Sequence, residues 1–271
     1  MKTKSDLMSA KPKSGIGDAE WQVRLDLAAC YRLAELFQWT DLVYTHISAR
    51  VPGIRDEFLI NRFGLAFDEI TASNLIRVDL EGNVTDASGA PVHKAGFVIH
   101  SAVHGARSDA GCVVHTHSTA GVAISTLADG LLPLSQHANL FYGRIAYHDH
   151  EGLAVGVDER SRLVNDLGPH PAMILRNHGL LVVGRTVPEA FSIMHHLEKA
   201  CQVQLFAMAT GAKLTTPVES VCRKTATQGF ASPGARSAQW NGQQCCAGSN
   251  GLIRIIGTEF QGYGARRHST S

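Results

Sequence analysis

The spacing of hydrophobic residues along the chain predicts short strands that alternate with amphipathic helices. Residues 19–39 carry apolar side chains at helical intervals with charged residues between them, which predicts a helix of about five turns. Residues 44–51 and 57–61 alternate between apolar and polar positions, and Pro52-Gly53 between them favours a hairpin. Further along, the same reasoning predicts strands at 75–80, 111–114, 140–147 and 172–175, a strand that ends at 184, and helices at 97–106, 118–128 and 186–210.

The order of these elements predicts how the chain is divided. No repeat, linker or low-complexity tract interrupts it before about residue 211, and strands alternate irregularly with helices. This favours one α/β domain around a mixed or antiparallel sheet. We expect a disordered lead-in at 1–18, one domain at 19–224 and a poorly ordered tail at 225–271. Gly, Ser, Gln and Asn dominate the tail, and the periodicity of helices and strands is lost there.

The composition is that of a chain that can bury a full core and carries little net charge. Of its 271 residues 44% are apolar, and 25 basic residues face 24 acidic ones. This balance argues against a polyanion-binding surface, so no nucleic-acid partner is expected. Charge or histidine interrupts the apolar stretches every few residues, which predicts no membrane span. Six cysteines without a Cys-x-x-Cys spacing suit a reducing cytoplasm.

Two segments at the ends of predicted strands carry candidate metal ligands. Alternation along residues 111–117 places His115 and His117 on the same face of a strand, so both imidazoles can reach one ion. His178 follows a second apolar strand, in its turn. Three neutral nitrogen ligands that leave one position open suit catalytic zinc. The alternative is that each is a core histidine satisfied by a backbone carbonyl, since the chain has 14 histidines.

Other histidines form weaker patterns. His100 and His104 lie four residues apart on one face of the helix predicted at 97–106. Ser101 follows His100, so the glutamate of a His-Glu-x-x-His metalloprotease is absent, and a pair lining a cleft or the core is favoured. A further group on the last long helix is expected to form its polar flank: His195, His196 and Glu198.

Short motifs spread over roughly residues 20–210 occur in an order that matches a known pattern. They are Tyr44-Thr45-His46-Ile47-Ser48, Phe58-Leu59-Ile60-Asn61, Gly64-Leu65, Asp68-Glu69-Ile70-Thr71, Arg107-Ser108-Asp109, His115-Thr116-His117-Ser118, Tyr142-Gly143 and Asn177-His178-Gly179. Together they resemble the class II aldolase/adducin family. The resemblance implies a three-layer α/β/α fold with a mostly antiparallel central sheet, and a homo-oligomer, usually a tetramer, with active sites at subunit interfaces. It also implies that His115, His117 and His178 hold zinc.

The chain departs from the pattern of the family's aldolases at three places. Those enzymes carry a catalytic glutamate before the His-x-His segment, and that stretch falls on Lys94-Ala95-Gly96, where Gly96 can neither ligate a metal nor transfer a proton. Thr45-His46-Ile47-Ser48 and Asn61-Arg62-Phe63-Gly64 replace the small donors that hold the substrate phosphate. The adducin-like branch, which the chain resembles at Ala95-Gly96-Phe97, shares the loss of the glutamate.

The resemblance and its departures imply a metal-dependent enzyme of the class II aldolase type, an aldehyde-lyase, acting on a small carbonyl or hydroxy-acid substrate. The three histidines would hold Zn²⁺ as a Lewis acid. With the glutamate lost, proton transfer passes to a histidine that titrates near neutrality. The candidates for proton transfer are, in order, His100, His46 and His137, and those for substrate binding are Asn61, Arg62 and Gly64.

Two other functions fit the same residues. A three-histidine site with open positions could hold Fe²⁺ and activate oxygen, as in a small group of non-haem iron oxygenases that resembles this family, because imidazole suits both metals. Alternatively, an adducin-like binding protein keeps the fold without catalysis. The three intact histidines favour an enzyme with a small-molecule substrate. The resemblance implies a homo-oligomer, and the charge balance and the interrupted apolar stretches predict neither a nucleic-acid nor a membrane partner.

Overall fold

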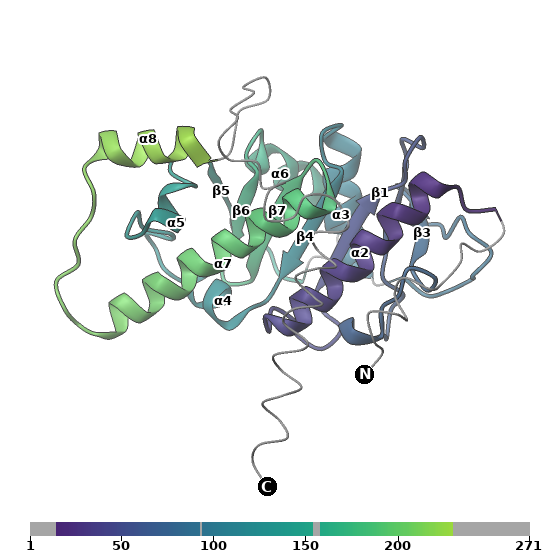
Figure 1. Cartoon of the computed structure of the whole chain (residues 1–271), viewed down its shortest axis with the longest axis horizontal. Helices are drawn as coiled ribbons and strands as arrows, with labels where there is room; N and C mark the ends of the chain where they lie inside the picture. Colours follow the sequence, from purple (N-terminus) through teal and green to yellow (C-terminus); the bar gives the residue numbers. More distant parts are fainter. Residues whose placement is uncertain (1–14, 93, 154–157, 230–271) are drawn as a thin grey trace, which may run out of the picture.

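A seven-stranded sheet forms the centre of the computed structural model, which describes residues 15–92, 94–153 and 158–229 (Figure 1). Its strands are β1 (His46–Arg50), β2 (Glu57–Ile60), β3 (Ile76–Asp79), β4 (Cys112–Thr116), β5 (Ile145–His148), β6 (Ala172–Leu175) and β7 (Gly179–Gly184). Their spatial order is β3-β2-β1-β4-β7-β6-β5. All neighbours pair antiparallel except β5 and β6, which run parallel. The predicted hairpin of β1 and β2 is confirmed.

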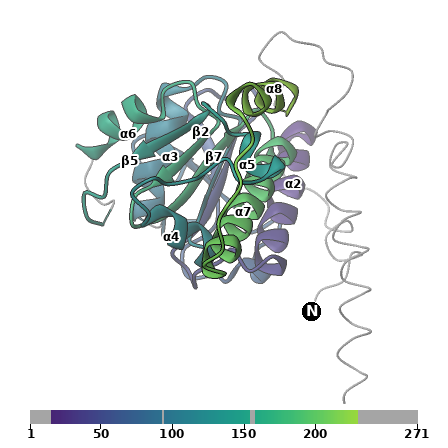
Figure 2. The ribbon, with the colours of Figure 1, turned by 90° about the vertical axis from the view of Figure 1, so that its left-hand side faces the viewer.

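Helices cover both faces of the sheet (Figure 2). They are α2 (Asp18–Leu36), α3 (Lys94–Ala106), α4 (Thr119–Ser125), α5 (Gln136–Asn139), α6 (Glu159–Leu167), α7 (Val187–Ala209) and α8 (Glu219–Gly229), with a 3-10 turn, η1, at Phe67–Glu69. Helices α2 and α7 pack against each other and on one face, and α3 and α6 pack on the other. The expected three-layer α/β/α fold with a mostly antiparallel sheet is therefore confirmed.

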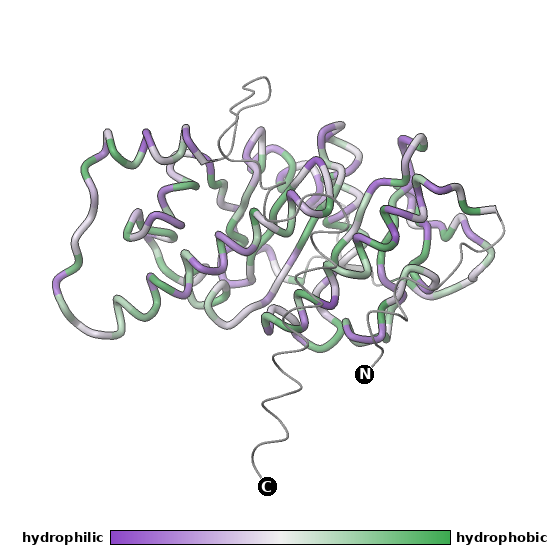
Figure 3. Tube along the Cα trace, in the orientation of Figure 1, coloured by the Kyte–Doolittle hydropathy of each residue, from purple (hydrophilic) through white to green (hydrophobic). Residues whose placement is uncertain are grey.

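Alternation along the strands divides the core into two halves. In β4, Cys112 and Val114 join the apolar cluster under α2 and α7, whereas Val113 joins the cluster under α3 and α6. Every residue of β4, β6 and β7 is buried, as expected for strands covered on both faces. The hydropathy trace accordingly shows hydrophobic segments through the middle of the molecule (Figure 3). It follows that His115 lies on the α3 side of β4 and Thr116 on the α7 side.

Helix α7 is the longest described helix, and the sequence specifies both of its ends. The Thr186 hydroxyl accepts a hydrogen bond from the backbone N–H of Glu189, 3.3 Å away, and Pro188 lies in the first turn. Gly211 follows the helix with a φ of 66°, a left-handed conformation that glycine adopts without strain. In Figure 3 the helix alternates between hydrophobic and hydrophilic residues, and its hydrophobic stripe packs on β4 and β7.

Two predicted boundaries differ from the structure. The segment predicted as a strand at 140–147 starts with a turn after α5 and pairs as β5 only from Ile145. Helix α8 extends across residue 224, where the domain was expected to end. The predictions for 1–14 and 230–271 lie outside the described residues. Among those described, the cysteines are free and buried, and no helix has both the length and the apolar character to cross a membrane.

Candidate metal centre

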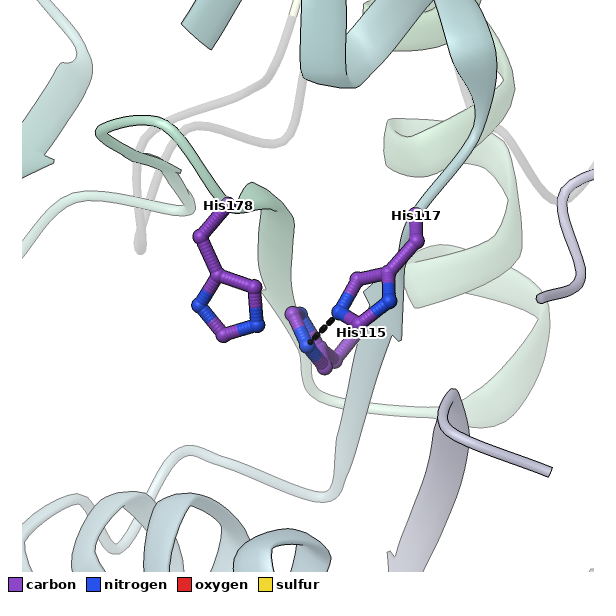
Figure 4. A group of neighbouring side chains, drawn as sticks. All are labelled: His115, His117 and His178. Carbon is purple, nitrogen blue, oxygen red and sulfur yellow. Dashed lines mark hydrogen bonds between the residues drawn. The ribbon is translucent and has the colours of Figure 1, made fainter. Parts of the chain in front are cut away.

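The three histidines predicted as metal ligands converge in the structure (Figure 4). His115 lies in β4, His117 follows the strand, and His178 lies in the turn between β6 and β7. One ligand nitrogen of each lies within 4.8 Å of the other two. The antiparallel pairing of β4 with β7 brings the β6–β7 turn against the end of β4, so residues more than 60 positions apart meet at one point.

The turn that carries His178 depends on its two neighbours. Asn177 has a φ of 57°, in the left-handed region that asparagine tolerates better than most residues. A Cβ on Gly179 would lie 2.3 Å from the carbonyl oxygen of Thr116. Only glycine therefore lets β7 begin so close to the His-Thr-His segment. The Asn-His-Gly sequence places the third imidazole where it can share an ion with the other two.

Hydrogen bonds at Nδ1 show that two of these rings fit a metal ion. Nδ1 of His115 donates to the carbonyl oxygen of Leu180 at 2.9 Å, and Nδ1 of His117 donates to the Asp41 carboxylate at 3.1 Å. In neutral rings both Nε2 atoms then carry lone pairs. These two Nε2 atoms face each other 2.9 Å apart, which only a shared cation makes favourable. A divalent metal bound by both nitrogens would supply such a cation.

Burial keeps two imidazoles of the cluster neutral, the form that binds metal. His115 is 1% exposed, and burial, followed by the nearby His178 and His117, holds its pKa well below the usual value. Burial and His117 lower the pKa of His178 to about 4. These two imidazoles would therefore lose no proton on binding a metal at neutral pH.

A second set of histidines forms a hydrogen-bonded chain between β1 and α3. Nδ1 of His104 donates to the carbonyl oxygen of Ala110 at 3.1 Å, so its Nε2 accepts from the Ser48 hydroxyl at 2.8 Å. The Ser48 oxygen in turn accepts from Nδ1 of His100. Nε2 of His100 then accepts from Nδ1 of His46 at 3.1 Å. This series of hydrogen bonds starts at a backbone carbonyl, which only accepts. The donor and acceptor roles that follow from it place the lone pair of His46 on Nε2.

The His46 imidazole fills the space beside Gly96. A Cβ added to Gly96 would lie 2.6 Å from Cδ2 and 3.0 Å from Nε2 of this ring. His46 also pairs with His115 across β1 and β4, and their ring centroids are 5.2 Å apart. Of the three histidines predicted for proton transfer, His46 therefore lies next to the cluster of His115, His117 and His178. His100 lies one hydrogen bond further away.

The buried histidines predict a loss of stability in acid. Burial holds the pKa of His100 well below 6.5, and burial together with Arg50 lowers the pKa of His104 to about 3. Both groups bind protons more readily in the unfolded chain, so each contributes stability above about pH 6.5 that is lost as the pH falls toward its folded pKa. The loss is about 1.4 kcal/mol per pH unit and group. Glu198 makes the opposite contribution to the pH dependence of stability. Burial raises its pKa to about 7, so protonation of this carboxylate in the folded chain adds stability as the pH falls.

We therefore expect the urea midpoint of unfolding to decrease steeply between pH 6.5 and pH 4. Circular dichroism at a series of pH values measures this midpoint, with the metal removed so that its own pH dependence does not contribute. A midpoint that stays constant from pH 6.5 to pH 4.5 would contradict the neutral state of His100 and His104.

The other predicted site residues lie apart from the cluster. His137 on α5 contacts His196 of α7, with ring centroids 5.9 Å apart. Asn61 is buried and accepts a hydrogen bond from the Tyr31 hydroxyl at 2.9 Å. Arg62 and Gly64 follow β2 and are exposed. In the described part of the chain no hydrogen bond or ring contact joins these residues to the cluster, and their roles stay predictions.

Two carboxylates near the cluster are not apparent from the sequence alone. Asp41, the partner of His117, lies in an exposed segment that nothing in its sequence distinguishes. Glu198 was expected on a polar flank of α7, and this is wrong: it is 1% exposed and accepts hydrogen bonds from Thr116 and Ser118. A signal was present, because Glu198 continues the helical spacing of a buried apolar stripe. That stripe contains Val187, Ala190, Phe191, Met194 and Cys201.

Known proteins share both the sequence and the fold. Residues 25–205 match the Class II Aldolase and Adducin N-terminal domain. Alpha-adducin of Rattus norvegicus is 46% identical over 191 residues, which are 69% of this chain but 26% of alpha-adducin. The crystal structure of an aldolase II superfamily protein from Pseudomonas syringae has a TM-score of 0.81 and 48% identity, covering 90% of this chain and 95% of that one.

An enzyme is among the similar structures. L-fuculose 1-phosphate aldolase from Glaciozyma antarctica PI12 has a TM-score of 0.75 and 30% identity, covering 97% of this chain and 98% of that one. The family match spans most of the described domain, and the similarity to both structures extends over nine tenths of the chain or more. The chain therefore belongs to the class II aldolase and adducin N-terminal domain family.

Proposed function

We propose that this protein is a metal-dependent lyase of the class II aldolase type that cleaves or forms a carbon–carbon bond in a small carbonyl or hydroxy-acid substrate. The observation that carries the proposal is the pair of Nε2 lone pairs on His115 and His117, which face each other beside His178. The similarity to an L-fuculose 1-phosphate aldolase supports the reaction class. When bound, Zn²⁺ would polarise the substrate carbonyl as a Lewis acid.

In this proposal His46 moves the proton. The resemblance places the aldolases' catalytic glutamate at Gly96, and the His46 ring fills the volume that a side chain at that position would enter. The hydrogen bonds through His100 and Ser48 leave the lone pair on Nε2 of His46. This nitrogen lies 3.0 Å from the position of a Cβ added to Gly96. Nε2 of His100 accepts the hydrogen bond from Nδ1 of His46, so its role is to orient that ring.

The remaining expectations are part of the same proposal. Arg62 is exposed and positively charged, and it would attract an anionic group of the substrate, with Asn61 and Gly64 in the same segment. We place the protein in the cytoplasm, as a homo-oligomer with the tetrameric state that the resemblance implies. The identity of 46% with alpha-adducin favours one second candidate, a binding protein that keeps the fold without catalysis.

Metal analysis of the protein purified without chelator tests the proposal. We expect close to one zinc ion per chain, because neutral imidazole nitrogens bind zinc well and the cluster offers three of them. Inductively coupled plasma mass spectrometry measures the metal content, and a screen of small aldehydes and keto acids then tests for lyase activity. Stoichiometric iron would favour the oxygenase instead. Absence of metal, with none bound on titration, would favour the binding protein.

A further inference from the structure

A buried carboxylate lies behind the three-histidine cluster, on the opposite face of β4. Glu198 of α7 accepts a hydrogen bond from the Thr116 hydroxyl at 3.1 Å and one from the Ser118 hydroxyl at 2.6 Å. These are the residues on either side of His117. The Ser118 oxygen also accepts from the backbone N–H of Gly121 at 3.0 Å, which caps α4. One carboxylate therefore fixes both sides of a metal ligand and the start of the following helix.

Hydrogen bonds from two hydroxyls, but no cationic side chain of the described residues, compensate the charge of Glu198. The side chain is 1% exposed, and no ion pair involves it among the described residues. Burial raises its pKa to about 7, although the hydrogen bonds from Ser118 and Thr116 lower it. A buried carboxylate without a cation is costly, so it usually has a partner. A divalent ion held by His115 and His117 would supply positive charge across the same strand.

We propose that Glu198 is a positioning residue of the metal centre: it holds the strand end that carries His117, and its negative charge favours a cation at the three histidines. This inference rests on the proposed function, because it requires that the cluster bind a metal. Outer-shell partners of metal ligands contribute about 10- to 100-fold to metal affinity. Glu198 supports His117 through its neighbours, whereas Asp41 does so by direct contact with the ring.

The Glu198→Gln variant tests the inference at pH 8, where the carboxylate is mostly ionised. Glutamine keeps the shape of the side chain but removes the charge and one acceptor oxygen. We expect about tenfold weaker zinc binding in competition with a chromophoric chelator, and a shifted visible spectrum of the Co²⁺-substituted protein. The melting temperature of the metal-free variant should equal or exceed that of the wild type, because a buried charge without a cationic partner is gone. A side chain that only stabilised the fold would lower the melting temperature on replacement.

Gln204 on the same helix provides a matched control. It is also 1% exposed, and it makes two hydrogen bonds of 2.7 and 2.8 Å to the backbone of Leu132 and Gly130, away from the cluster. Gln204→Ala should lower the melting temperature and leave zinc affinity within twofold of the wild type. The inference is overturned if Glu198→Gln binds zinc within twofold of the wild type, or if Gln204→Ala weakens binding equally. A wild type that binds no zinc would instead overturn the proposed function.

Discussion

His117→Ala is expected to weaken zinc binding by more than 100-fold and to leave the chain folded. In the proposed centre the imidazole supplies one of three ligand nitrogens, so its loss should exceed the roughly 10- to 100-fold effect of an outer-shell partner. The fold tolerates the change because His117 lies beyond the end of β4 and its side chain is partly exposed, so no large cavity forms. The variant also removes the opposed lone pairs of His115 and His117 from the metal-free protein.

Competition with a chromophoric chelator measures the affinity, and circular dichroism confirms the fold. His137→Ala is the control, because it removes an imidazole that contacts His196 on α7 and makes no hydrogen bond or ring contact with the cluster among the described residues. That variant should bind zinc as the wild type does. If His117→Ala retained full zinc stoichiometry at wild-type affinity, His117 would not be a ligand.

The sequence allows the histidine cluster to be predicted because the placement of its members is local. Strict alternation puts His115 and His117 on one face of a strand, and the Asn-His-Gly turn follows directly from a second strand. What alternation leaves open is the register between strands. The pairing of His46 with His115 across β1 and β4 joins positions 69 residues apart, and no local pattern specifies it.

The supporting groups are harder to predict, because they depend on which helix covers which face. Thr116 points away from the ligands, toward α7, and meets Glu198 there. From the sequence alone, a glutamate beside two histidines on a helix favours an exposed flank, since charged residues are rarely buried. At Glu198, however, the spacing of the hydrophobic stripe of α7 favours a buried position. A charged residue at a buried position is expected where the residue serves a site rather than the core.

The structure also changes what is required to restore the aldolases' glutamate. Gly96→Glu alone would place its Cβ 2.6 Å from Cδ2 and 2.9 Å from Cγ of His46, inside a buried region between β1 and α3. Overpacking in a core costs about 1–3 kcal/mol, and burying a carboxylate adds to this. We therefore expect Gly96→Glu to destabilise the chain by about 3 kcal/mol and to show no retro-aldol activity on sugar phosphates.

Removing the His46 ring should reverse much of this loss. The double variant Gly96→Glu/His46→Ala gives the new carboxylate the volume that the imidazole occupied. Its free energy of unfolding should therefore be more than about 1 kcal/mol higher than the value obtained by adding the two single effects. Urea unfolding of the four chains of this cycle measures the coupling. The double variant is also assayed for retro-aldol activity on sugar phosphates, and no activity would show that the phosphate-holding donors replaced in this chain are required as well. Additive effects would mean that His46 does not occupy the place of a side chain at position 96, and the proton-transfer role proposed for it would lose its structural basis.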